Sequence, residues 1–308
     1  MAIVNGELPV WRSLLYVPAN VERYIEKAHT YGADCIQLDL EDSVPASEKA
    51  RARASIAAAS RHLRERGVDV AVRINRSLDL AVRDIEAAVG FDVDALNISK
   101  VHSAAHLQLL DELVSDLERA RGIAVGQTRF IAMIETSSAF FQMPGIAHAT
   151  TRLVAMGFGS EDFALELGMR PTEETLAMPK QQMIIAAASA GLLPLGFIAS
   201  ISNYRDPDAF RVMARRSRAF GFAGVGCVHP SQVPIVNEAY TPTAEEVAEA
   251  KRIVAACQVA GSTGRGSFAI DGSMIDRPVA LRAERVIRQH FAIEAREART
   301  RVHESPQA

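Results

Sequence analysis

The stretch Thr128 to Asp162, TRFIAMIETSSAFFQMPGIAHATTRLVAMGFGSED, decides the fold of this chain. It contains two apolar runs separated by a segment with a helical pattern, an arrangement typical of parallel strands that are covered on both faces. Parallel neighbours end at the same edge, so Glu135 after the first run and Asp162 after the second should meet in one cleft. Two such carboxylates suit a hard cation such as Mg²⁺. Alternatively, both acids merely mark strands that emerge into solvent.

Length and composition allow one large α/β domain. The chain has 308 residues, is 48% hydrophobic and carries a formal charge of -3 without a block of like charges. These properties favour neither nucleic acid nor a membrane surface as a partner. The first residues lack the features of a signal peptide and no apolar stretch is long enough to span a membrane, so a cytoplasmic protein is expected. The three cysteines lack CxxC spacing and are expected to be reduced thiols.

Eight apolar runs recur along the chain, each followed by a helical pattern, such as Ser138 to Ala149 after the fifth run. Eight such units predict a (β/α)₈ TIM barrel over residues 1–260 rather than an open doubly wound sheet. No GxGxxG or GxxxxGK[ST] motif favours the open-sheet nucleotide folds. The expected strands are Arg12 to Val17, Asp34 to Leu40, Asp69 to Asn75, Ala95 to Val101, Phe130 to Glu135, Leu153 to Phe158, Leu195 to Ser200 and Ala223 to Val228.

Active sites of such barrels lie at the carboxyl ends of the strands, and polar residues follow most of the expected strands. Arg73, near the end of the run VAVRIN, is expected to face several carboxylates. A guanidinium there can bind a substrate carboxylate through two parallel hydrogen bonds. The alternative is that Arg73 merely pairs with Glu41 or Asp42. Further polar residues at expected strand ends are Tyr16, Asn20, Asp39, Asn75, Lys100, His102, Glu161 and His229.

Residues 261–308 form an extension beyond the eighth unit. A Gly- and Ser-rich stretch precedes Pro278, which suits the first turn of a helix. This extension is not a ninth barrel unit. We expect that it caps its own barrel, or reaches over the active face of a neighbouring subunit and places Asp276 there.

With these motifs in view, the sequence resembles the citrate lyase β-subunit-like group of the HpcH/HpaI aldolase superfamily, which includes malyl-CoA and citramalyl-CoA lyases. The resemblance extends from Arg12 to Ile287. Each motif is short, but their order and intervals are specific. The motifs are RSLLYVPAN (12–20), LDLEDSV (38–44), VRIN (72–75), MIET (133–136), GSEDFALELG (159–168), CVHPSQV (227–233) and GSMIDRP (272–278).

The resemblance implies that Glu135 and Asp162 hold Mg²⁺, or alternatively Mn²⁺, and that Arg73 binds the oxo-acid. It implies that Asp276 is an acid/base supplied by the adjacent subunit of a homotrimer or hexamer. Val225 departs from the family, which often has Lys there, and this leaves the thioester carrier open. The residues expected to receive coenzyme A are Tyr16, Asn20, Arg23 and Lys27. The substrate site is expected to be completed by Glu41, Asp42, Gly159, Ser160 and Glu161.

The expected reaction is the reversible carbon–carbon cleavage of a 3-hydroxyacyl-CoA thioester that carries a second carboxylate, such as citramalyl-CoA or malyl-CoA. The products would be acetyl-CoA and a 2-oxo acid. Two other enzymes remain possible: a citrate lyase β subunit that receives its citryl thioester on a carrier protein, and a CoA-free aldolase acting on hydroxy-oxo acids. A barrel that serves only as a binding module is a further alternative, because fold alone does not establish function. The intact acid pair argues against it.

Overall fold

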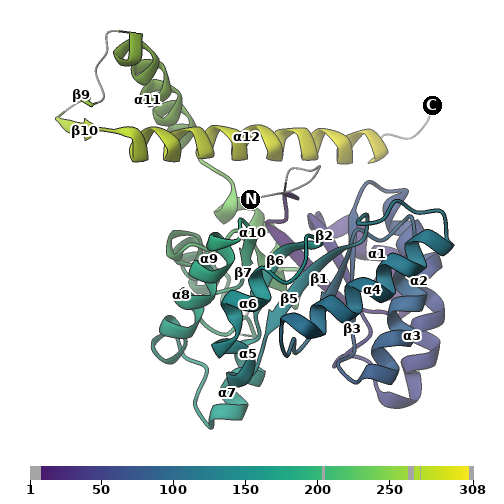
Figure 1. Ribbon diagram of the computed structural model, residues 1–308. Coiled ribbons are helices and arrows are strands. Elements are labelled where there is room, and N and C mark those ends of the chain that lie inside the picture. Colours follow the sequence, from purple (N-terminus) through teal and green to yellow (C-terminus); the bar gives the residue numbers. More distant parts are fainter. Residues whose placement is uncertain (1–7, 203–204, 263–266, 271, 305–308) are drawn as a thin grey trace. The chain divides into compact units, whose positions relative to one another are not determined.

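A computed structural model (Figure 1) describes residues 8–202, 205–262, 267–270 and 272–304, and the chain divides into two compact units, Met1–Tyr240 and Thr241–Ala308. The first unit contains eight parallel strands in the order β7-β6-β5-β4-β3-β2-β1-β8. A bridge between Leu195 and Gly224 joins β7 to β8, so the sheet closes and the expected (β/α)₈ TIM barrel is confirmed. The strands are β1 (Ser13–Pro18), β2 (Cys35–Asp39), β3 (Asp69–Ile74), β4 (Ala95–Ile98), β5 (Arg129–Ile134), β6 (Leu153–Phe158), β7 (Leu193–Leu195) and β8 (Val225–Cys227).

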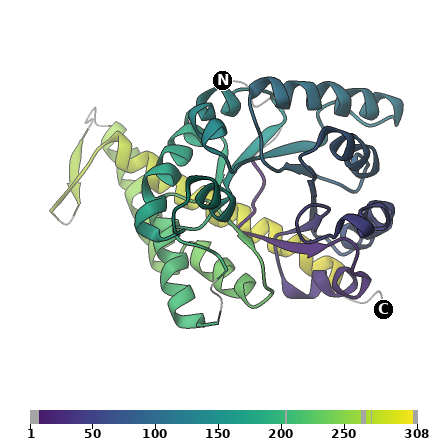
Figure 2. The same cartoon turned by 90° about the horizontal axis from the view of Figure 1, so that it is seen from below.

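Helices surround these strands, as the view in Figure 2 shows. In the first unit they are α1 (Glu22–Ala28), α2 (Lys49–Arg64), α3 (Leu78–Ala88), α4 (Ala104–Ala120), α5 (Ser137–Phe141), α6 (Met143–Ala147), α7 (Ser160–Leu167), α8 (Glu173–Ser189), α9 (Pro207–Phe220) and α10 (Gln232–Tyr240), with short 3₁₀ turns at His29–Tyr31 and Ala46–Glu48. Each strand therefore has a helical layer on its outer face, which explains why the strand sequences are almost continuously apolar.

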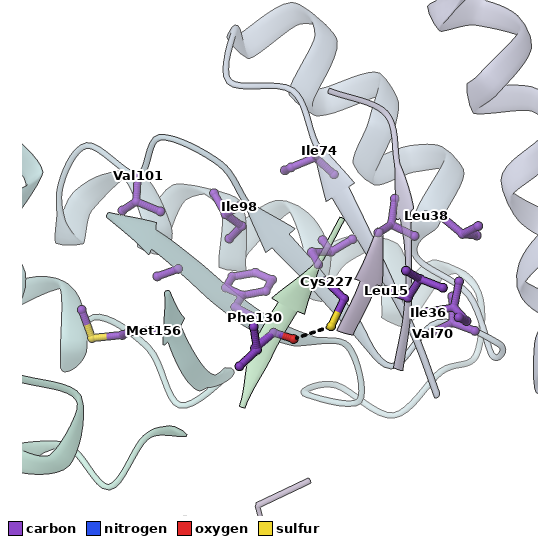
Figure 3. Packing of buried hydrophobic residues seen from close by; sticks show 14 of the residues in the cluster. Leu15, Ile36, Leu38, Val70, Ile74, Ile98, Val101, Phe130, Met156 and Cys227 are labelled. Carbon is purple, nitrogen blue, oxygen red and sulfur yellow. Dashed lines mark hydrogen bonds between the residues drawn. The ribbon is translucent and has the colours of Figure 1, made fainter. Parts of the chain in front are cut away.

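Strand residues alternate between two apolar cores. Figure 3 shows Leu15, Ile36 and Phe130 in the larger core, which lies between the strands and the helices. The intervening residues face the barrel interior, where Cys35, Ala71 and other small or aliphatic side chains form a second cluster. This cluster packs the middle of the barrel, and the interior polar residues Gln37, Asp39 and Arg73 lie nearer the carboxyl ends of their strands.

The seventh strand lies earlier in the chain than expected. The predicted range was Leu195 to Ser200, whereas β7 ends at Leu195. Beyond it, the carbonyl oxygens of Phe197, Ile198 and Ala199 accept hydrogen bonds from the buried ammonium of Lys180, at 2.6, 3.3 and 3.0 Å. These carbonyls therefore bond to a side chain of α8 instead of extending the strand.

Two helical predictions also need correction. The helix expected over Ser138 to Ala149 is divided into α5 and α6, with Pro144 in the first turn of α6. The segment after β6, expected as a plain strand exit, is the helix α7, which ends at Gly168 in the left-handed conformation. Asp162 therefore lies in the first turn of a helix rather than at the end of a strand.

The second unit contains α11 (Ala244–Ser262), the antiparallel strands β9 (Phe268–Ile270) and β10 (Ser273–Ile275), and the long helix α12 (Arg277–Glu304). The expected boundary followed residue 260, but α11 packs along α12, so the units divide after Tyr240. The helix expected from Pro278 is present and begins one residue earlier. Across the described ranges, the helices are too short or too polar to span a membrane.

Candidate active site

A cavity of about 410 Å³ opens at the carboxyl ends of the barrel strands. This volume lies within the range of small-molecule sites, and the position is where barrel enzymes bind substrates. Of the predicted substrate and metal residues, the cavity wall includes Asp42, Arg73, Glu135, Gly159, Ser160, Glu161 and Asp162. The expectation that the acids at adjacent strand ends meet in one cleft is therefore confirmed for Glu135 and Asp162.

Arg73 is held in the cavity wall by a carboxylate on the neighbouring strand. Its Nε and Nη2 donate to the two carboxylate oxygens of Asp39 at 2.7 and 2.6 Å, because these residues are paired in the register of β2 and β3. Nη1 lies 2.8 Å from Glu41 Oε2 and 3.8 Å from Asp42. The sequence alternative that Arg73 pairs with Glu41 or Asp42 is thus correct in part, but its main partner is Asp39.

Asp39 is almost fully buried and is an integral part of this arrangement. Burial raises the pKa of Asp39, but the bonds from Arg73 and from the Ser43 hydroxyl outweigh it and hold the pKa below its usual value. The backbone N–H of Glu41 also donates to Asp39, at 2.9 Å. Asp39 therefore stays ionised, orients the guanidinium and shapes the turn that carries Glu41.

Glu135 lies just beyond β5 and is 5% exposed. Burial raises the pKa of Glu135 to about 7; the N–H of Lys100 opposes this effect, while the charges of Asp162 and Glu41 add to it. Gly159 makes room for this side chain, because a Cβ at that position would overlap the Glu135 carboxylate. The site thus contains a crowded carboxylate that a nearby cation would stabilise in its charged form.

Asp162 and Glu161 project from the first turn of α7. Asp162 Oδ1 lies 3.5 Å from the ammonium of Lys100, and Glu161 accepts a hydrogen bond of 2.5 Å from the Ser200 hydroxyl. Lys100 donates its backbone N–H to Glu135 Oε2 at 2.6 Å. One residue therefore contacts both predicted metal ligands, which places Glu135 and Asp162 within one small group.

The four residues expected to receive coenzyme A are in different places. Tyr16 lies in the cavity with its ring 4.9 Å from the Arg73 guanidinium carbon, and burial raises the pKa of its phenol. Asn20, Arg23 and Lys27 follow β1, outside the cavity wall. Arg23 lies over the ring of Tyr24 at 5.0 Å, and the Oδ1 atom of Asn20 is buried and has no hydrogen-bond partner among the residues that the structure describes.

Two further predicted features have clear positions. Val225 is 1% exposed, belongs to the apolar core between strands and helices, and also lines the cavity, where it contributes no charge. Asp276, in the second unit, precedes α12 and is half-buried. Its Oδ1 accepts the N–H of Val279 at 3.2 Å, so this carboxylate caps the helix.

The donor set fits a hard divalent cation. Within the described residues no cluster of three or more His, Cys, Asp and Glu side chains is arranged to hold a metal. Glu135 and Asp162 would therefore supply two oxygen ligands and leave the other positions to water and substrate, as is usual for Mg²⁺. The raised pKa of Glu135 beside Asp162 supports this fit, because a bound cation would relieve the repulsion between them.

Lys100 and Asp39 belong to the site although the sequence marked them only as strand-end polar residues. Asp39 lies within the motif LDLEDSV (38–44), two residues before Glu41, and its alternation with Gln37 indicates an inward side chain. The interior Gln37 in turn accepts a hydrogen bond of 2.8 Å from Asn97. Gln37 and Asp39, two polar residues on alternate positions of an apolar strand, were therefore the sequence signal for the polar interior residues of the cavity wall.

Two lyases are similar to this chain in sequence over most of their length. The chain is 32% identical over 281 residues to a citrate lyase subunit beta of Leuconostoc mesenteroides subsp. cremoris, covering 90% of this chain and 92% of that one. It is 33% identical over 308 residues to an L-malyl-CoA/beta-methylmalyl-CoA lyase of Cereibacter sphaeroides, covering 92% and 96%. These names agree with the expected enzyme class, a lyase.

Solved structures extend the comparison. CitE of Mycobacterium tuberculosis, in complex with magnesium, acetoacetate and coenzyme A, has 30% sequence identity and a TM-score of 0.72, covering 91% of this chain and 97% of that one. A citrate lyase of Burkholderia xenovorans has a TM-score of 0.79 at 21% identity over 94% and 93%, which supports the fold. The family model for HpcH/HpaI aldolase/citrate lyase matches residues 12–230, nearly the whole barrel. With its barrel, its strand-end acids and these relatives in agreement, the chain belongs to the HpcH/HpaI aldolase/citrate lyase family.

Proposed function

We propose that this protein is a Mg²⁺-dependent carbon–carbon lyase that cleaves a 3-hydroxyacyl-CoA dicarboxylic thioester, such as citramalyl-CoA or malyl-CoA, to acetyl-CoA and a 2-oxo acid. The observation that carries the proposal is the charge of the cavity. Acidic side chains predominate around it, namely Asp39, Glu41, Asp42, Glu135, Glu161 and Asp162. Arg73 and Lys100 form the ion pairs with them. A divalent cation would balance this excess and allow an anionic substrate to enter.

Arg73 is the side chain suited to bind the oxo-acid carboxylate. A guanidinium has five N–H donors; the fork with Asp39 uses Nε and one hydrogen of Nη2, and Nη1 pairs with Glu41 Oε2 at 2.8 Å. Further Nη hydrogens remain for a ligand in the cavity that Arg73 lines. The fork fixes the plane of the guanidinium, so binding a second carboxylate needs little reorganisation.

The chemistry that Mg²⁺ would supply on Glu135 and Asp162 is Lewis-acid polarisation of the substrate hydroxyl and its adjacent carboxylate. Loss of the hydroxyl proton lets the carbon–carbon bond break, and the departing carbon retains the electron pair as a thioester enolate. The positive field of Arg73 stabilises the developing oxyanion charge. In the proposal Asp276, from the adjacent subunit of a homotrimer or hexamer, would accept the hydroxyl proton and give it to the enolate carbon.

Coenzyme A binding is assigned to the segment after β1. Arg23 and Lys27 are exposed cations that suit the phosphates of the coenzyme. If the coenzyme binds there, a concentration one hundred times its Kd should stabilise the protein by about 2.7 kcal/mol. A thermal unfolding scan with and without free coenzyme A tests this, and an Arg23→Ala, Lys27→Ala double variant should lose most of the stabilisation.

The second candidate is a citrate lyase β subunit whose thioester is held by a carrier protein. The 32% identity to a protein named citrate lyase subunit beta favours it. Purified chain assayed alone with citramalyl-CoA, malyl-CoA and citryl-CoA separates the candidates. Turnover of a CoA thioester supports the first, whereas activity that requires an acylated carrier protein supports the second.

The metal assignment is tested by Glu135→Ala. This variant should lose Mg²⁺-dependent turnover, because half of the protein's ligand set is removed. The matched control is Glu112→Ala, at an exposed position of α4, which should keep the rate of the parent protein. An unchanged rate in Glu135→Ala would remove the metal role and the mechanism with it.

A further inference from the structure

Lys100 has an unusual backbone conformation next to the cavity. Its φ is +47°, and within the described ranges it is the one residue other than glycine with positive φ. This left-handed region is unfavourable for a long side chain. Such residues persist where the surrounding contacts fix them, often at functional sites.

The contacts of Lys100 converge on the acidic group. Its N–H donates to Glu135 Oε2 at 2.6 Å, and its ammonium donates to Glu41 Oε1 at 2.7 Å. The ammonium also lies 3.5 Å from Asp162 Oδ1 and 3.6 Å from Asp42 Oδ2. The backbone of Lys100 thus fixes one predicted metal ligand while its side chain contacts the other.

We propose that Lys100 is a positioning residue, an internal counter-ion that neutralises the acidic pair in the metal-free protein and yields Asp162 to the divalent cation. The inference deepens the proposed function and rests on its metal site. The ammonium is closest to Glu41, so it can give up the longer contact with Asp162 and keep a charged partner. Lys100 therefore stabilises the protein without metal and opposes metal binding, because its charge repels a cation at the same carboxylate.

Removal of the Lys100 charge should destabilise the metal-free protein and strengthen Mg²⁺ binding. In Lys100→Met the carboxylates face one another without their ammonium, so the metal-free protein should unfold at a lower temperature than the parent. Mg²⁺ should bind more tightly, with a Kd lower by roughly tenfold or more, the order by which a neighbouring charge shifts the affinity of a carboxylate for a proton. A side chain with a merely structural role would not increase metal affinity.

The measurement is isothermal titration calorimetry of the full chain with MgCl₂, without substrate. Lys100→Gln is the second variant, since its amide can still donate to Glu41 and supports folding if Lys100→Met does not fold. Lys100→Arg restores the charge and should return the Kd toward that of the parent. Lys49→Met is the matched control, because that ammonium donates to the carbonyl oxygens of Leu40 and Glu41 at 2.8 Å each and should leave the Kd unchanged.

The outcomes separate this inference from the proposed function. A parent protein that binds Mg²⁺ and cleaves a thioester, with an unchanged or higher Kd in both uncharged variants, overturns the role of Lys100 alone. A parent protein that shows no Mg²⁺ binding overturns the metal site and the inference together. Tighter binding in the uncharged variants with reversal in Lys100→Arg supports both.

Discussion

Replacement of Glu135 by Gln should stabilise the metal-free protein at alkaline pH. The pKa of Glu135 is raised to about 7 from an ordinary value of 4.5, chiefly by burial. Since one pH unit corresponds to about 1.4 kcal/mol, ionising this buried carboxyl costs the folded state about 3 kcal/mol at pH 8. Glutamine has nearly the same shape and can accept the Lys100 N–H, but it carries no charge to desolvate.

The sign follows from proton linkage. The folded state holds the Glu135 proton more tightly than the unfolded state does, so stability is highest below about pH 4.5 and falls as the pH rises through about 7. The free energy of unfolding of Glu135→Gln should therefore exceed that of the parent by about 3 kcal/mol at pH 8, and the two should converge toward pH 5. Catalytic turnover should be lost at the same time.

Urea unfolding in EDTA at pH 5 to 8, followed by circular dichroism, measures this difference. Glu112→Gln, on the exposed face of α4, is the control and should match the parent at every pH. The reasoning about Glu135 is refuted if the Gln variant is less stable than the parent at pH 8, or if the difference between them does not change with pH. In excess Mg²⁺ the parent should instead have the higher free energy of unfolding, since a bound cation favours the charged form of Glu135.

Other substitutions test the remaining parts of the site. Gly159→Ala should weaken Mg²⁺ binding and lower kcat by about a hundredfold, because its Cβ overlaps the Glu135 carboxylate. Calorimetry measures the Kd for Mg²⁺ and initial rates measure kcat. The control Gly145→Ala, where a Cβ meets nothing within 4 Å, should change neither. Asp39→Asn should cost about 3–5 kcal/mol in urea unfolding at pH 7, because it breaks the buried pair with Arg73. The Asp39 pKa is lowered, so the loss should shrink as acid protonates this carboxyl in the parent. Asp276→Asn should greatly lower kcat with little change in the Kd for Mg²⁺, and full activity would refute its proton role. Lys180→Met should cost about 1–3 kcal/mol and raise KM, because it frees the carbonyls of the cavity-lining segment after β7; an unchanged KM would contradict this.

Much of the fold followed from hydrophobic pattern alone. Runs such as Phe130 to Ile134 pack against helices on one face and against the barrel interior on the other, so they stand out from the rest of the chain. The seventh strand was misplaced because its apolar continuation is held by Lys180, a long-range contact that no local pattern contains. The division of α5 from α6 and the existence of α7 likewise depend on how short segments pack on the barrel.

The site was predictable to the extent that strand ends define it. Glu135, Asp162 and Arg73 meet because parallel strands end at one edge of the barrel. The fork between Arg73 and Asp39 depends on the register of β2 and β3, which sequence did not determine. The left-handed turn at Lys100 was also not predictable, because a lysine in a strand exit ordinarily has negative φ.

Gly157, within β6, and Gly159, directly after β6, should differ in the substitutions that they tolerate during evolution. Gly157 adjoins the flexible side chain of Met133, whereas Gly159 adjoins the Glu135 carboxylate. A larger residue at position 157 would displace the Met133 thioether, which can adopt other rotamers. The cavity wall at Gly157 can therefore change during evolution while Glu135 and Asp162 keep their positions. A larger residue at position 159 would displace the Glu135 carboxylate itself. Among homologues with different acyl-chain preferences, substitutions should therefore occur at Gly157 and be selected against at Gly159.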